Sequence, residues 1–122
     1  MPQKINIEAS FDKFSDTFSP KIVGEVNGQH VKLVRLEGDK VPWHTHDEED
    51  EMFYVLEGEL DVLERDRTIT LQHGELYIVS HGVEHRVVPH GHVKLMLVEP
   101  ASTKHTGDVQ SEITLEKHDW LE

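Results

Sequence analysis

The sequence predicts an all-β fold, a small barrel or sandwich. Two observations carry this prediction. Most of the chain divides into short runs rich in Val, Ile, Leu, Phe and Tyr, and residues typical of turns separate these runs at short intervals. No strand-sized run alternates with a helix-sized one, so a parallel sheet with crossover helices is not expected. Nine short strands in 122 residues are typical of a barrel.

The N-terminal segment, residues 1–21, predicts a short helix. Phe11, Phe14 and Phe18 recur at a helix-like spacing between polar residues, and Pro20 ends the run. One or two helical turns that pack against an edge of the sheet fit this pattern.

The strands follow in order, each bounded by turn residues. Asn27-Gly28 is a strong two-residue hairpin signal. Glu57-Gly58 and the Pro89-His90-Gly91 segment also predict breaks between strands. The expected strands are Ile22–Val26, His30–Glu37, Val41–His46, Glu51–Leu56, Glu59–Glu64, Thr68–Leu71, Leu76–Val79, His85–Val88 and Val93–Glu99.

The length predicts one domain over residues 1–122, with the barrel core at about residues 22–100. Residues 101–122 are expected to form a tail. Within the tail, Glu112–Glu116 alternates and can add a late edge strand. Leu121 and Glu122 are consistent with a cloning remnant and are set aside from the functional argument.

Composition excludes several classes of function. The chain has no cysteine, so disulfides, thiolate nucleophiles and sulfur-ligated metals are ruled out. Its net charge of −12 disfavours binding to nucleic acid. No apolar run approaches the ~20 residues of a membrane span, and the start of the chain does not resemble a secretory signal. We expect a cytoplasmic protein.

Four side chains predict a metal site. His44 and His46 are two residues apart, so in an extended segment they point to one face. Glu51 follows a short acidic turn, and His85 lies in a second segment punctuated by glycines. Three imidazoles and a carboxylate suit a first-row transition metal. The alternative is that these are surface residues beside an acidic loop.

The same residues resemble the two motifs of the cupin superfamily. Residues 38–58 match every defined position of the first motif, Gly-x5-His-x-His-x(3,4)-Glu-x6-Gly. Residues 74–89 are similar to the second, Gly-x5-Pro-x-Gly-x2-His-x3-Asn, at Gly74, Gly82 and His85. Ser80 and Pro89 depart from the second motif, which usually has Pro and Asn there. Neither position ligates metal in the family, so the departures put the shape of the loop in doubt and leave the assignment of the metal ligands unchanged.

The resemblance implies a double-stranded β-helix, or jelly-roll, barrel. It implies that His44, His46, Glu51 and His85 ligate one divalent ion (Zn, Ni, Fe or Mn) and leave positions for water or substrate. Small proteins with these motifs are often likened to a mannose-6-phosphate isomerase group. Because the superfamily also includes dioxygenases, epimerases, decarboxylases, storage proteins and sugar sensors, the fold does not define the reaction.

Further residues are predicted to line the pocket. If Glu51 faces inward, strand alternation turns Phe53 and Val55 inward as well, and Val87 lies beside His85. Trp43 is either a rim or core aromatic or a pocket wall, and His81 is either a solvated turn residue or a proton shuttle. The pocket residues are therefore Trp43, Phe53, Val55, His81 and Val87.

Two functional hypotheses follow. The first is a metal-dependent enzyme, an isomerase or dioxygenase, acting on a small oxygen-rich molecule. The second is a non-catalytic module in which the metal anchors a carbohydrate or organic acid for binding or sensing. We also expect a homodimer, because a small barrel leaves open sheet edges and residues 1–26 and 109–116 can pair across a two-fold axis. No catalytic residue beyond the metal ligands is evident.

Overall fold

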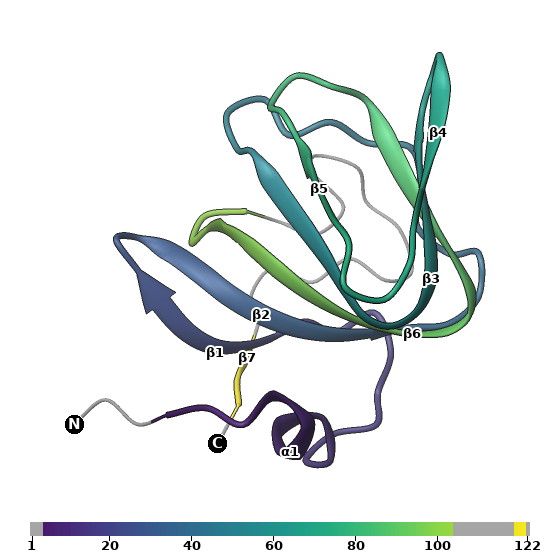
Figure 1. Cartoon of the computed structure of the whole chain (residues 1–122). Helices are drawn as coiled ribbons and strands as arrows, with labels where there is room; N and C mark the ends of the chain where they lie inside the picture. Colours follow the sequence, from purple (N-terminus) through teal and green to yellow (C-terminus); the bar gives the residue numbers. More distant parts are fainter. Residues whose placement is uncertain (1–3, 104–118, 122) are drawn as a thin grey trace.

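The computed structural model describes residues 4–103 and 119–121 and confirms the all-β jelly-roll prediction. A short helix, α1 (Ile7–Phe11), precedes the sheet, and the strands are β1 (Lys21–Val26), β2 (Gln29–Leu36), β3 (Glu51–Glu64), β4 (Arg67–Leu71), β5 (Leu76–Val79), β6 (His85–Pro100) and β7 (Asp119–Trp120). Hydrogen bonds order the strands β4-β3-β6-β2-β1-β7, and β5 also pairs with β3. Figure 1 shows β3 and β6 curving strongly as they wrap around the interior.

Three strand predictions were wrong, and two of them failed in the same way. Glu57-Gly58 is not a turn between strands, because β3 continues through it with two shifts of register against β6. Pro89-His90-Gly91 does not end β6 either. Gly58 and Gly91 have φ values of 92° and 71° and therefore bend these long strands without interrupting them.

The third error concerns residues 41–46, which do not form a strand. Only His44 pairs there, in an isolated bridge with His85. Pro42 lacks a backbone N–H and cannot support a longer ladder. The segment is an extended loop that lies against the start of β6.

The core fills the inner face of the curved sheet. Alternation along β3 buries Phe53 and Val55 and leaves Met52, Tyr54 and Leu56 half-buried on the outer face, as the sequence pattern predicted. The buried cluster consists of Phe18, Val34, Leu36, Val41, Phe53, Val55, Leu60, Val62, Leu71, Val79, Val87, Val93, Leu95 and Leu97. This apolar layer surrounds the candidate site and separates it from solvent.

The N-terminal segment covers the outside of the sheet (Figure 1). The side chain of Asn6 accepts a hydrogen bond from the N–H of Ala9 (2.9 Å) and caps α1, which ends at Phe11. The helix therefore includes only the first of the three predicted phenylalanines. Phe18, with a φ of 55°, leaves the helical path and enters the core instead.

The end of the described chain returns to the sheet. β7 pairs in parallel with β1, and the N–H of Leu121 donates to the carbonyl of Ile22 (2.9 Å). The end of the predicted tail thus contributes a short strand, and Leu121, which we set aside as a remnant, adds a backbone hydrogen bond beside it. The predicted edge strand at residues 112–116 lies outside the described residues. No helix in the described ranges is long and apolar enough to cross a membrane.

Candidate metal centre

Backbone hydrogen bonds fix three of the four predicted ligands. His44 and His85 exchange both N–H···O bonds, each 2.9 Å long, across their bridge. The N–H of Gly82 donates to the carbonyl of His46 (2.8 Å) and ties the second loop to the first. Glu51 is the first residue of β3 and lies in its ladder. The site is therefore built on a sheet ladder, which restricts its motion.

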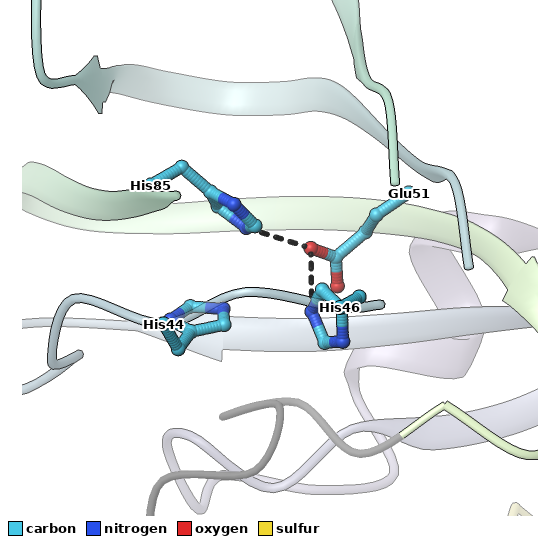
Figure 2. Close-up of side chains that lie close together, drawn as sticks. All are labelled: His44, His46, Glu51 and His85. Atoms are coloured by element: carbon cyan, nitrogen blue, oxygen red, sulfur yellow. Dashed lines mark hydrogen bonds and ion pairs between the residues drawn. The ribbon is translucent and has the colours of Figure 1, made fainter. Parts of the chain in front are cut away.

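The four side chains converge in the interior (Figure 2). One possible ligand atom from each of His44, His46, Glu51 and His85 lies within 4.8 Å of the others. All four residues are buried, with exposed fractions of 4% or less. The Glu51 Oε1 atom is 3.3 Å from His85 Nε2 and 3.4 Å from His46 Nε2. Two ligands at about 2.1 Å from an ion lie roughly 3.0–3.4 Å apart at octahedral to tetrahedral angles, so these separations fit one ion.

The ring orientations favour a metal as well. Nδ1 of His44 donates to the carbonyl of Pro42 (2.7 Å), and Nδ1 of His85 donates to that of Val83 (2.9 Å). These bonds assign the ring proton to Nδ1 and leave Nε2 as the ligand atom, as is usual for metal-bound histidine. Nε2 of His44 is buried without a hydrogen-bond partner among the described residues, whereas Nε2 of His46 has only the 3.4 Å contact with Glu51 Oε1. Because an orphaned buried nitrogen is costly, this arrangement suits a cation at the centre.

The charges of the cluster point the same way. Burial, followed by the nearby His85, lowers the pKa of His44 from 6.5 to about 4, so this ring is neutral at physiological pH. Burial alone would raise the pKa of Glu51, but the adjacent imidazole rings of His46 and His85 lower it well below its usual range. The carboxylate is therefore ionised. A neutral imidazole and a carboxylate are the forms that bind a metal.

A small cavity opens beside these ligands. Its volume is about 40 Å³. His44 and Glu51 are its only polar lining residues in the described part of the chain; the others are Phe18, Pro20, Val34, Leu36, Val41, Phe53, Val87, Leu95 and Leu97. A ligand in this cavity would meet the metal site on one side and an apolar wall on the others.

The predicted pocket residues are found in different places. Phe53 and Val87 line the cavity, whereas Val55 lies in the core on the same face of β3. Trp43 lies under the guanidinium of Arg65, 3.9 Å from the ring centre. His81 is at the surface, where its Nδ1 and backbone N–H both bond to Asp50 Oδ1 (2.8 Å each).

Sequence reasoning missed two charged residues behind the site. Lys32 and Glu99 are buried, and Lys32 Nζ donates to Glu99 Oε1 (2.8 Å). Burial and the neighbouring Glu51 carboxylate raise the pKa of Glu99 well above its usual range, and the Glu99 carboxyl hydrogen-bonds that of Glu51. Only a protonated Glu99 can donate this bond. The two-residue alternation of the strand could have revealed that Glu99 is buried, because Glu99 lies two and four residues after the inward-facing Leu97 and Leu95.

Comparisons with known proteins agree with this geometry. Residues 32–100 match the model of the cupin domain. The chain is 31% identical over 87 residues to the uncharacterised protein YdbB of Bacillus subtilis, covering 70% of this chain and 76% of that protein.

Two solved structures are similar. A cupin-2 domain-containing protein from Shewanella frigidimarina is 42% identical, with a TM-score of 0.76, and the match covers 79% of this chain and 93% of that one. Protein NMB1881 from Neisseria meningitidis is 29% identical, with a TM-score of 0.72, and the match covers 80% and 99%. With the motif residues gathered on a jelly-roll sheet and a matching domain over more than half its length, the chain belongs to the cupin family.

Proposed function

We propose that this cupin is a metal-dependent enzyme acting on a small oxygen-rich molecule. The supporting observation is the buried Nε2 atom of His44, which has no hydrogen-bond partner among the described residues and lies with His46, Glu51 and His85 within reach of one ion. A bound divalent ion with open positions would polarise a carbonyl, acidify a bound water or activate dioxygen. Iron would fit an oxygenase, whereas zinc, nickel or manganese would fit isomerisation or lyase chemistry.

The protein's own residues define the substrate class. The ligands would hold the oxygen-bearing end of the substrate, because apart from His44 and Glu51 the described cavity lining offers it no polar group. Phe53, Val87 and Leu97 would exclude water and accept the carbon skeleton. A diketone or a catechol has this combination of chelating oxygens and apolar carbon. A mannose-6-phosphate isomerase-like activity is the less favoured form of the proposal, because a sugar needs more polar partners than this lining supplies.

A non-catalytic binding or sensing module is the second candidate. The observation that favours it is that the described cavity has no acid or base besides His44 and Glu51, which are themselves candidate ligands. In this alternative the ion anchors an organic acid or carbohydrate, and no bond is broken.

Metal content and turnover separate the candidates. Protein purified without added metal should contain close to one equivalent of a transition metal by elemental analysis. His46→Ala should lose it, while His73→Ala, a control at an exposed turn histidine, should retain it. Iron together with oxygen uptake on a diketone or catechol would support the oxygenase. A metal-loaded protein that binds organic acids but turns nothing over would support the module, and unchanged metal in His46→Ala would contradict the ligand assignment.

We also propose that the protein forms a homodimer through the outer face of β5 and β3. Leu76 and Ile78 of β5 are 49% and 54% exposed, and they pair across the sheet with the half-buried Tyr54 and Met52. Such a contiguous apolar surface is typical of an interface. Ile78→Glu should convert a dimer into a monomer in light scattering coupled to size exclusion. A wild-type monomer at high concentration would contradict the proposal.

A further inference from the structure

A buried lysine and a buried carboxyl group lie in contact on the inner wall of the sheet behind the metal centre. The side chains of Lys32 and Glu99 have exposed fractions of 1% and 0%, and 2.8 Å separates Nζ from Oε1. Burying a lysine with a carboxyl group costs more free energy than burying an apolar pair of the same size in many proteins. A role beyond stability is therefore the more economical explanation for its presence.

The register of the strands places this pair next to one metal ligand, Glu51. β3 and β6 pair Met52 with Val98, so the next step along the ladder places Glu51 opposite Glu99. β2 and β6 pair Lys32 with Leu97, which makes Lys32 a diagonal neighbour of Glu99 on the same face. The resulting chain of contacts runs from Lys32 to Glu99 and from Glu99 to Glu51.

We propose that Glu99, held by Lys32, is the positioning residue that aims the Glu51 carboxylate at the metal. This inference rests on the proposed metal-dependent function. Glu51 needs such support because it is the first residue of its strand, directly after the loop of residues 47–50, and its side chain has several rotatable bonds. Glu99 does not line the cavity, so it acts through Glu51 and does not touch the substrate.

The magnitude follows from known metal sites. Hydrogen-bond partners of ligating residues typically contribute about 10–100-fold in metal affinity. Glu99→Gln keeps both contacts, since its amide oxygen can accept from Lys32 and its amide N–H can donate to Glu51. The double variant Lys32→Met with Glu99→Leu removes both contacts and replaces the pair by apolar side chains of similar size, so it should still fold.

Cobalt(II) titration of the full chain tests the proposal, with visible absorption reporting the ligand geometry and a competing chelator the affinity. We expect Glu99→Gln to stay within about 3-fold of wild type, and the double variant to bind about 10–100-fold more weakly with shifted absorption bands. Thermal unfolding of the metal-free proteins checks that each variant is folded. Glu99→Asp is a second, milder variant: it keeps a carboxyl group on β6 but withdraws it from Glu51 by one methylene group, and should also weaken binding.

The outcomes are distinguishable. A folded double variant, or a folded Glu99→Asp, that binds cobalt with wild-type affinity and spectrum overturns the positioning role while leaving the metal site intact. Equal losses in Glu99→Gln and the double variant overturn it as well, because the retained hydrogen bonds would then not matter. Wild-type protein that binds no cobalt overturns the proposed function, and this inference with it.

Discussion

Replacing Gly58 by alanine should destabilise the barrel at the point where β3 bends. Gly58 has a φ of 92°, which L-residues rarely adopt, and it lies at a shift of register between β3 and β6. A Cβ atom added there would be 2.6 Å from the backbone oxygen of His92 and 3.2 Å from Val93 Cγ2. The first contact is with backbone, which cannot move away without breaking the pairing of the two long strands.

Two costs add up. The positive φ costs a residue with a Cβ about 1–2 kcal/mol. Forcing a methyl group into a packed site costs about 1–3 kcal/mol more. The expected loss is therefore about 2–5 kcal/mol, a large part of the ~5–15 kcal/mol that stabilises a typical small protein.

Gly74 offers a matched control. Its φ is 86°, but an added Cβ would find no heavy atom within 4 Å, so Gly74→Ala should lose only the backbone cost of about 1–2 kcal/mol. Urea unfolding followed by circular dichroism gives both values. Equal losses in the two variants would refute the argument that the contact with His92 limits this position.

Two further predictions concern acid stability and the N-terminal segment. Because the pKa of His44 falls from 6.5 to about 4 on folding, the unfolded chain binds the extra proton between these values. His44 alone should therefore remove up to about 3 kcal/mol of the stability of the metal-free protein as pH falls from 6.5 to 4, and His44→Gln should change the dependence of stability on pH by this amount in urea titrations; an unchanged slope would contradict it. Arg35 donates to the carbonyls of Phe11 (2.7 Å) and Phe14 (3.0 Å), so Arg35→Met should cost about 2 kcal/mol. The Arg35→Met variant should also be cleaved faster by proteases at sites before Lys21, while its metal affinity stays unchanged. A loss of metal binding would contradict this prediction and would show that the N-terminal segment supports the site.

The alternation of side chains made the inner face of the site predictable. Glu51, Phe53 and Val55 share a face in any extended strand, and His44 and His46 do so in any extended loop. These features depend on local geometry, which a short sequence pattern specifies.

The continuity of the long strands was not predictable in this way. Gly58 and Gly91 carry the same local signal whether they turn the chain back or bend a strand, and the pairing of β3 with β6 decides between the two. The Lys32–Glu99 pair was missed for a related reason. A lysine and a glutamate 67 positions apart suggest solvent exposure when each is considered alone, and only the register of β2, β6 and β3 brings them together in the interior.

The charge of the site limits what it can bind under the proposed function. A divalent ion with the ionised Glu51 carries a formal charge of +1, because the three imidazoles are neutral when they bind a metal. A monoanionic oxygen ligand, such as an enolate or a carboxylate, would neutralise this charge in an apolar cavity of about 40 Å³. A phosphosugar brings a second charge and several hydroxyls, and the described lining has no polar residue besides His44 and Glu51 to receive them. The acidic residues 47–50, on the loop between His46 and Glu51, would repel it further. Both the charge and the lining therefore favour a small, singly charged chelating substrate over a sugar phosphate.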